Sequence, residues 1–206
     1  MTDIPTVYII DDNEEHREIL VELVELAGFI GQPFDSGTEF LKLNQWKKIG
    51  CILLDNQMPD KTGIQVQAEL NKRGCDLPII FVTGGSMISD AVRAVQEGAF
   101  GFLEKPIQSK ELIDSIKKAI ALCKIQMSHQ NTRQEFRTSL EKLTGRERQI
   151  YDLVIRGKTN KMISTELTIK IGTVEFHRAN MMEKMGVNTF SELMELTHNA
   201  NPIPKN

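Results

Sequence analysis

The chain has 206 residues, 40% of them hydrophobic, and a net charge of −3. This length suffices for two small domains, each with its own core. No stretch approaches the roughly 18 apolar residues of a membrane span, and the first residues lack the basic region and cleavage site of a signal peptide. A cytoplasmic protein is therefore expected. Three scattered cysteines, Cys51, Cys75 and Cys123, fit free thiols in a reducing compartment.

The charge is unevenly distributed along the chain. Residues 1–122 hold 12 basic against 19 acidic side chains, whereas residues 123–206 hold 13 basic against 9 acidic ones. A basic half joined to an acidic half indicates a nucleic-acid-binding segment attached to a domain with another task. Taken alone this is weak support, because charge runs are usually only solvated surfaces.

The first half alternates short apolar runs with amphipathic, helix-like stretches at 14–28, 37–44, 63–74 and 89–98, most of which stop at a glycine. Strands are predicted at 6–10, about 30–34, 51–54, 78–82 and 100–103. Five alternations within about 120 residues predict a doubly wound α/β domain, with a five-stranded parallel sheet in the flavodoxin-like order.

Polar side chains follow four of these five strands. Asp11 and Asp12 follow the first strand, Asp55 the third, Thr83 the fourth and Lys105 the fifth. Because the carboxyl ends of parallel strands meet at one edge of a sheet, these groups are expected to lie together. Three carboxylates repel one another unless a hard cation lies among them, and oxygen ligands suit Mg²⁺. For any one of these residues alone, a turn cap or a surface charge is the plainer interpretation.

As a set, these motifs resemble the receiver domain of two-component response regulators over residues 1–122. The resemblance is carried by Asp11-Asp12, Asp55 with Met-Pro three residues on, Gly63, Thr83 and Lys105-Pro106. It implies that Asp55 accepts a phosphoryl group from a sensor histidine kinase. It further implies a metal site and a switch, with these members: Asp11, Asp12, Asp55 and the Gln57 carbonyl for Mg²⁺, Thr83 and Lys105 for phosphoryl oxygens, Phe102 as the switch aromatic, and a cis Lys105-Pro106 bond.

The chemistry expected of this site is self-phosphorylation and self-dephosphorylation, with no other enzymatic activity. Mg²⁺ and Lys105 would offset charge on the phosphoryl oxygens during attack by Asp55. Haloacid-dehalogenase-type phosphatases also use a strand-end aspartate, but they require a second aspartate where this chain has Gln57. A regulator whose receiver works without phosphate is the other alternative, and the intact acidic set disfavours it.

Residues 109–140 contain neither Gly nor Pro, which predicts a long helix with a linker at 123–139. This linker would form a coiled coil in a dimer or remain a solvated helix. The polar residues 128–137 slightly favour the solvated helix.

Three further helices are predicted at 145–156, about 159–167 and 172–185. Two short helices joined by a tight turn suggest a helix-turn-helix, although simple helical hairpins share this pattern. Residues 140–198 resemble the LuxR-type helix-turn-helix of NarL/FixJ response regulators, and "TVEFHRANMMEKM" is most similar to the FixJ-like branch. The resemblance implies that residues 140–206 form an all-α DNA-binding domain.

On a helical wheel of the third of these helices, Val174, Met181 and Met185 form the buried stripe. Glu175, Phe176, Ala179 and Glu183 lie opposite. The opposite side would read bases, while lysines around it would contact phosphates. His177 fits a phosphate contact and a partly buried core position equally well. The predicted DNA contacts are Lys158, Asn160, Lys161, Lys170, Thr173, Glu175, Phe176, His177, Ala179 and Lys184.

The sequence therefore predicts a transcription regulator whose binding to double-stranded promoter DNA depends on phosphorylation of Asp55. Its expected partners are a histidine kinase, promoter DNA and a second copy of the chain, with RNA polymerase as a further candidate and no membrane. Phosphorylation is expected to promote a homodimer through Ala91, Val95 and Phe102, because the proposed switch aromatic lies on that face.

Overall fold

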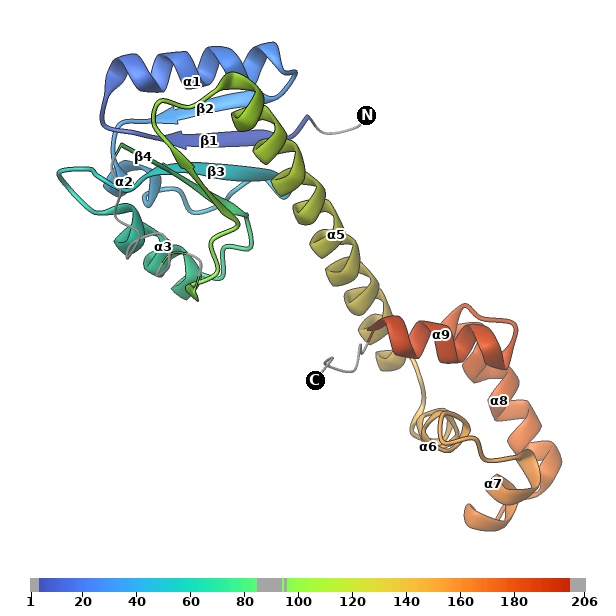
Figure 1. Ribbon diagram of the computed structural model, residues 1–206. Coiled ribbons are helices and arrows are strands. Elements are labelled where there is room, and N and C mark those ends of the chain that lie inside the picture. Colours follow the sequence, from blue (N-terminus) through green and yellow to red (C-terminus); the bar gives the residue numbers. More distant parts are fainter. Residues whose placement is uncertain (1–3, 85–93, 95, 201–206) are drawn as a thin grey trace. The chain divides into compact units, whose positions relative to one another are not determined.

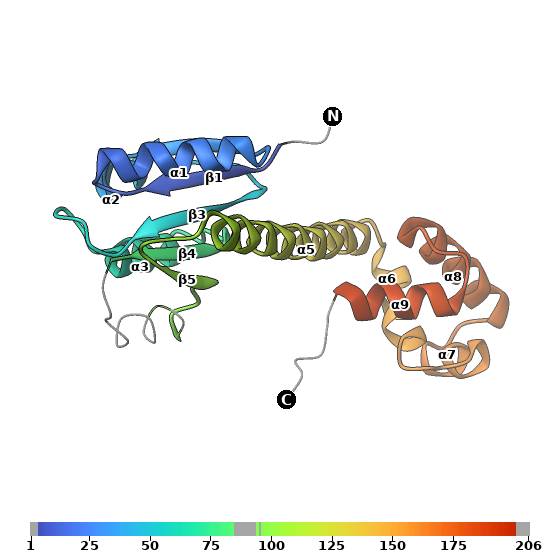
Figure 2. The same ribbon diagram turned by 45° about the horizontal axis from the view of Figure 1, so that its top comes forward.

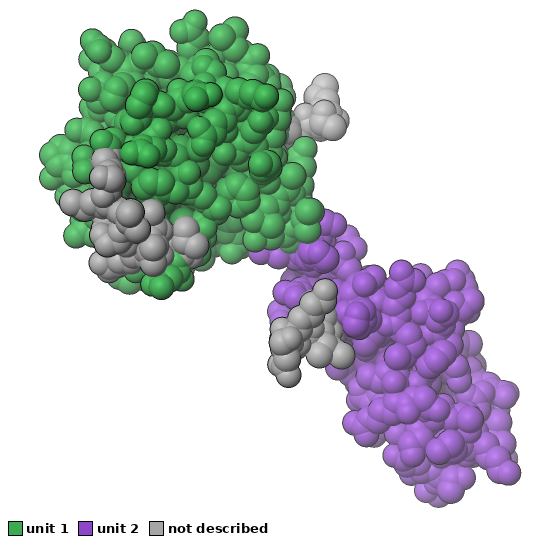
Figure 3. Space-filling model, viewed as in Figure 1, with its two compact units in different colours: residues 1–127 green, residues 128–206 purple. Residues whose placement is uncertain are grey.

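The computed structural model describes residues 4–84, 94 and 96–200 of the chain. They belong to two compact units, residues 1–127 and 128–206 (Figure 3). The division between the units falls inside the predicted linker 123–139. Each unit has its own hydrophobic core.

The first unit is built on a parallel sheet in the order β2-β1-β3-β4-β5, as predicted (Figures 1 and 2). The residues of β1, β3 and β4 are all buried, which explains why these strands are continuous apolar runs. β2 is an edge strand, where Pro33 is tolerated because its missing N–H faces no neighbouring strand. The bounds are β1 Thr6–Ile10, β2 Ile30–Phe34, β3 Gly50–Asp55, β4 Ile79–Thr83 and β5 Gly101–Glu104.

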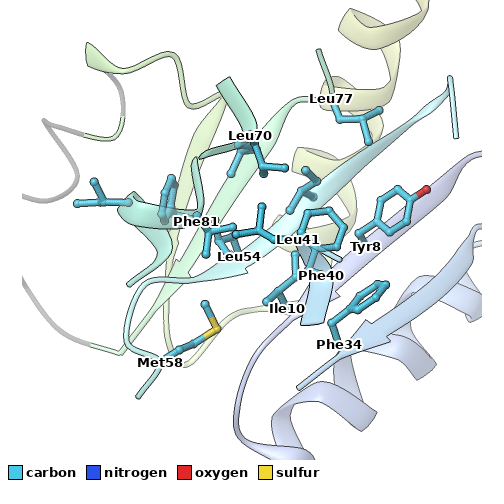
Figure 4. Close-up of a cluster of buried hydrophobic side chains, with 14 of the residues drawn as sticks. Tyr8, Ile10, Phe34, Phe40, Leu41, Leu54, Met58, Leu70, Leu77 and Phe81 are labelled. Atoms are coloured by element: carbon cyan, nitrogen blue, oxygen red, sulfur yellow. The ribbon is translucent and has the colours of Figure 1, made fainter. Parts of the chain in front are cut away.

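Helices cover both faces of this sheet (Figure 1). Because side chains alternate along a strand, Val7 and Ile9 pack beneath α1 (Glu14–Leu26) and the first turns of α5 (Ser109–Glu141). Tyr8 and Ile10 point to the other face, beneath α2 (Gly37–Phe40) and α3 (Gly63–Lys72). Figure 4 shows this second cluster, in which the Phe40 ring lies 5.4 Å from the Tyr8 ring and 5.1 Å from the Phe34 ring.

The first unit differs from the sequence prediction at one helix. The pattern at 37–44 predicts a longer helix than α2, which ends at Phe40 with Leu41 as its C-cap. Tight-turn hydrogen bonds from Lys42 to Glu39 and from Leu43 to Phe40 follow instead of a helix. The helical pattern at 89–98 falls largely outside the described residues, as do Ala91 and Val95.

The second unit is helical and contains α6 (Gly145–Val154), α7 (Asn160–Glu166), α8 (Ile171–Met185) and α9 (Phe190–Ala200). The three predicted helices are confirmed, and α9 was not predicted. Val174, Met181 and Met185 are the buried residues of α8, as the wheel indicated. α8 stops at Gly186, whose φ of 69° lies in the left-handed region that glycine adopts most readily.

The helix α5 is continuous over 33 residues and contributes to both cores. Leu112 and Ile116 are buried under the sheet of the first unit, whereas Phe136 is 4% exposed within the core of the second. Polar residues occupy most of the stretch between them. Across the part of the chain that the structure describes, no helix combines the length and apolarity needed to cross a bilayer.

Candidate functional site

Three carboxylates meet at the carboxyl edge of the sheet. Asp11 and Asp12 follow β1 and Asp55 ends β3, and one oxygen from each lies within 4.8 Å of the others. Asp11 and Asp55 are buried and Asp12 is exposed. This all-oxygen donor set fits a hard divalent cation such as Mg²⁺. The three strand-end carboxylates that the sequence predicted to lie together are therefore together.

Lys105 forms ion pairs with two carboxylates of this acidic cluster. Its Nζ lies 2.9 Å from Asp11 Oδ2 and 3.0 Å from Asp55 Oδ2. Burial would lower the pKa of Lys105, but the hydrogen bonds and charges of the two aspartates outweigh it, so the pKa lies above its ordinary value. The ammonium is therefore charged at neutral pH. The Lys105-Pro106 bond is cis, as expected.

The Asp55 carboxyl group is buried, and several neighbouring groups shift its pKa. Burial raises the pKa of its carboxyl group, and the charge of Asp11 adds to this effect. The Gln57 N–H, which donates to Asp55 Oδ1 at 3.1 Å, and Lys105 act in the opposite direction. The net result is a raised pKa, which means that the ionised form of the Asp55 carboxylate is destabilised. A cation bound beside it would stabilise this form. Gln57 itself is exposed, and its N–H is the group that contacts Asp55.

Position 63, where the loop after β3 ends and α3 begins, has no space for a side chain. A Cβ at this position would lie 2.7 Å from both the Asp55 carbonyl oxygen and a ring carbon of Phe81. The first residue of α3 therefore packs directly against the end of β3. Any larger side chain would displace the backbone that carries Asp55.

Thr83 and Phe102 lie on the two strands beyond Asp55. Thr83 is buried at the end of β4, and its carbonyl accepts from the Lys105 N–H at 2.8 Å. Phe102 is paired in register with Phe81 and is half-buried against the core cluster that includes Phe81. The two residues predicted to form the switch therefore lie on neighbouring strands that both reach the acidic edge.

Two site residues were missed from the sequence. His16 Nδ1 lies 3.3 Å from Lys105 Nζ, and Arg17 Nη1 donates to the Asp11 carbonyl at 2.8 Å. The available signal was spacing, because α1 begins two residues after Asp12 and side chains in a first helical turn point back toward its start. Such residues lie over the same sheet edge.

The exposed side of α8 carries the predicted base-reading residues. Glu175 and Ala179 are exposed, and the Phe176 ring is 62% exposed. His177 is half-buried, with its ring 5.5 Å from the Phe176 ring in an edge-to-face arrangement. Within the described residues the Glu175 side chain has no hydrogen-bond or ion-pair partner. Lys170 and Thr173, near the start of this helix, are also exposed.

The remaining predicted DNA contacts differ in how they are held. Lys158, Asn160 and Lys161 line a surface groove together with Arg178, which donates to Asn160 Oδ1 at 2.8 Å. Arg178 was not predicted as a DNA contact. Lys158 also lies 3.8 Å from Glu166.

Lys184 differs from these residues because its Nζ lies 2.7 Å from the buried carboxylate of Glu147. This hydrogen bond, opposed in part by burial, lowers the pKa of Glu147, and the Thr144 N–H acts in the same direction. Lys184 therefore stabilises the fold of the second unit through an ion pair.

Two family models match the chain. Residues 7–117 match the response regulator receiver domain, and residues 141–197 match the luxR family of bacterial regulatory proteins. These matches agree with the sheet order and the strand-end acidic cluster of the first unit and with the helical second unit. The class of protein is thus a response-regulator receiver joined to a LuxR-type DNA-binding domain.

Relatives of this class match almost the whole chain. The response regulator TodT of Pseudomonas putida is 37% identical over 93% of this chain and 84% of its own length, and FixJ of Bradyrhizobium diazoefficiens is 34% identical over 94% and 95%. Among solved structures, the response regulator StyR has a TM-score of 0.86 at 36% identity, over 95% of this chain and 98% of its own. Full-length FixJ from B. japonicum has a TM-score of 0.60 at 33% identity, over 97% and 98%. The chain therefore belongs to the FixJ-like response regulators of the NarL/FixJ family, which regulate transcription in response to phosphorylation.

Proposed function

We propose that Asp55 is the phosphoacceptor of this regulator and that Asp11, Asp12, Asp55 and the Gln57 carbonyl hold Mg²⁺. The observation that carries the proposal is the position of Asp55, which belongs to the acidic cluster and also contacts Lys105. A bound Mg²⁺ would supply positive charge for the phosphoryl oxygens and relieve the repulsion among the carboxylates.

Asp55, Lys105 and Thr83 have separate roles in the proposed phosphoryl transfer. An Asp55 oxygen forms a bond to phosphorus, while the bond to the kinase histidine breaks and its electron pair leaves with the imidazole. The Lys105 ammonium then donates to a phosphoryl oxygen, since its Nζ is already within 3.0 Å of the acceptor carboxylate. The Thr83 hydroxyl supplies a second donor, and its movement gives the half-buried Phe102 ring room to turn inward.

Incubation with acetyl phosphate and Mg²⁺ tests this assignment. We expect mass spectrometry to find one phosphoryl group on the wild type and none on Asp55→Ala or on a sample treated with a chelator. Asp60→Ala is the matched control, because Asp60 is an exposed aspartate of the same loop and should leave labelling intact. Labelling of Asp55→Ala equal to that of the wild type would refute the assignment.

We also propose that α8 lies in the major groove, with Glu175, Phe176 and Ala179 facing the bases. A carboxylate accepts from cytosine N4, and an aromatic edge or a methyl group contacts the thymine methyl. The remaining predicted contacts, with Arg178 added, would surround this face at phosphates. Lys184 has a competing role in its ion pair with Glu147, so its loss is expected to lower stability as well.

Substitution of Glu175 separates base reading from a structural role. The candidate structural partners of Glu175 are engaged elsewhere, since Arg178 bonds Asn160 and Lys184 bonds Glu147. We therefore expect Glu175→Ala to relax preference at one base pair by roughly 1–3 kcal/mol without changing the salt dependence. Lys161→Ala should weaken all sequences alike and reduce the salt slope by about one unit. Identical motifs selected by wild type and Glu175→Ala from a random DNA pool would exclude base reading.

We infer three further features of the regulator. It acts in the cytoplasm with a cognate sensor histidine kinase, it contacts RNA polymerase where it activates a promoter, and it has no enzymatic activity beyond its own phosphorylation and dephosphorylation.

Phosphorylation promotes a homodimer that matches a palindromic operator. Sedimentation with and without beryllofluoride measures the dimer, and an unchanged monomer fraction would exclude it. If Asp55→Ala binds promoter DNA as tightly as phosphorylated wild type, the phosphorylation-independent alternative holds.

A further inference from the structure

His16 is held at the edge of the acidic site by its own helix. Its backbone N–H donates to the Asn13 side chain, the N-cap of α1, at 3.0 Å. The imidazole Nδ1 lies 3.3 Å from Lys105 Nζ. The Lys105 side chain is 17% exposed and His16 is exposed, so the imidazole contacts a largely buried lysine from the protein surface.

The three protons of the Lys105 ammonium have three acceptors. They are Asp11 Oδ2 at 2.9 Å, Asp55 Oδ2 at 3.0 Å and His16 Nδ1 at 3.3 Å. An ammonium group only donates, so the ring nitrogen that faces it must present a lone pair. An imidazole nitrogen that accepts this hydrogen bond differs from the two carboxylates, because it brings no negative charge to the ammonium.

Most of the side chains around a small pocket beside this contact are apolar. His16 and Lys105 line this pocket, whose other walls come from α1, the segment after β5 and α5, among them Leu20, Pro106 and Leu112. These groups offer the ammonium no alternative hydrogen-bond acceptor from their side chains. The imidazole is therefore the polar partner that this wall of the site provides.

We propose that His16 is a positioning residue for phosphoryl transfer, which holds the Lys105 ammonium at the point where the phosphoryl oxygens arrive. This inference rests on the proposed role of Asp55. When acetyl phosphate is the donor, an Asp55 oxygen bonds to phosphorus, the bond from phosphorus to the acetate oxygen breaks, and acetate leaves with the electron pair. His16 exchanges neither protons nor electrons in this step.

The reason for a third partner without negative charge lies in what Lys105 must do. Once Asp55 carries the phosphoryl group, its oxygen is a weaker acceptor, and the ammonium must turn to a phosphoryl oxygen. If Asp11 were the only remaining partner, its negative charge would draw the ammonium away from Asp55. The hydrogen bond to His16 opposes this displacement without adding a competing charge.

Two substitutions of similar bulk isolate the hydrogen bond. His16→Asn places an amide oxygen where Nδ1 lies, whereas His16→Leu fills the space and offers no acceptor. With acetyl phosphate and Mg²⁺, we expect His16→Leu to be phosphorylated about five- to ten-fold more slowly than wild type, and His16→Asn within about two-fold of it. Rescue by Asn is the readout that a merely structural role of the ring would not produce.

A double-mutant cycle with Lys105 completes the test. In a Lys105→Met background, His16→Leu is expected to cause no further slowing. The inference is overturned if His16→Leu is as fast as wild type, if His16→Asn is as slow as His16→Leu, or if His16→Leu slows both backgrounds equally. A wild type that takes up no phosphoryl group would instead refute the proposed role of Asp55.

Discussion

Among the residues that the structure describes, two lysine ammonium groups bind buried carboxylates, one in each unit. Lys105 contacts Asp11 and Asp55 at the open edge of a sheet, where its partners are expected to change during phosphorylation. Lys184 contacts Glu147, which also accepts from the Thr144 N–H in a capping box at the start of α6. Under the proposed function the first arrangement exchanges partners, whereas the second joins α8 to the start of α6.

The Glu147 ion pair predicts a pH dependence of stability in the second unit. The folded pKa of Glu147 is lowered, so its contribution is complete above the unfolded value of about 4.3 and is lost as the pH falls through the folded pKa. Glu147→Gln should reduce the free energy of unfolding at pH 7 by roughly 1–2 kcal/mol. The difference from wild type should shrink below about pH 4.3, as measured by denaturant unfolding at several pH values.

Glu183→Gln is the control for this prediction. Glu183 is an exposed glutamate on α8, the helix that also carries Lys184, and it should leave stability unchanged at every pH. A deficit of Glu147→Gln that is equally large at pH 7 and at pH 3.5 would show that the lost contribution is not the ionised carboxylate.

The sequence predicted those side chains whose positions follow from the sheet. Asp11, Asp55 and Lys105 meet because the carboxyl ends of parallel strands share an edge once the strand order is known. Contacts made by side chains of helices carry no such rule. The Glu147–Lys184 pair joins residues 37 apart, and the His16–Lys105 contact joins residues 89 apart, so both depend on how the elements pack.

The helix α9 is not predicted from the sequence, although a local signal for it is present. The Thr189 side chain accepts from the Glu192 N–H at 3.2 Å, and the Glu192 carboxylate accepts from the Asn188 N–H at 2.7 Å. A threonine followed three residues later by a glutamate is a recognised helix-start pattern. α2 shows the opposite error, because amphipathic spacing continues past Phe40 while the backbone turns.

The C-terminal part of α5 is an element of the DNA-binding unit as well as of the linker. Phe136 is 4% exposed, and its ring lies 6.4 Å from the Tyr151 ring. Phe136→Ala should reduce the free energy of unfolding of this unit by about 3–5 kcal/mol, because it removes a buried aromatic side chain. Hydrogen exchange of the α6 amides measures this loss.

Phe176→Ala is the matched control, since this ring on α8 is 62% exposed and its removal should change stability little. A loss of less than about 1 kcal/mol for Phe136→Ala would mean that α5 does not contribute to this core.

At the scale of the whole molecule, the separate cores predict two unfolding transitions. One core surrounds the parallel sheet and the other contains Ile150, Ile163 and Leu193. Mg²⁺ should shift only the transition of the first unit, by about 1.4 kcal/mol at ten times its dissociation constant. Calorimetry with Mg²⁺ or a chelator measures this shift, which should be absent in Asp55→Asn. A shift in both transitions, or an equal shift in the variant, would contradict the proposed metal site.

The division of α5 between two cores has a consequence for building chimeric regulators. Residues 128–135 are exposed apart from Thr132, which is half-buried, and they lie between the last buried α5 residue of the first unit and Phe136. A gene fusion with its junction in this stretch leaves both cores complete. A junction at residue 140, which the sequence alone suggests, would leave Phe136 with the receiver and give the new protein a DNA-binding unit that lacks one of its core aromatic side chains.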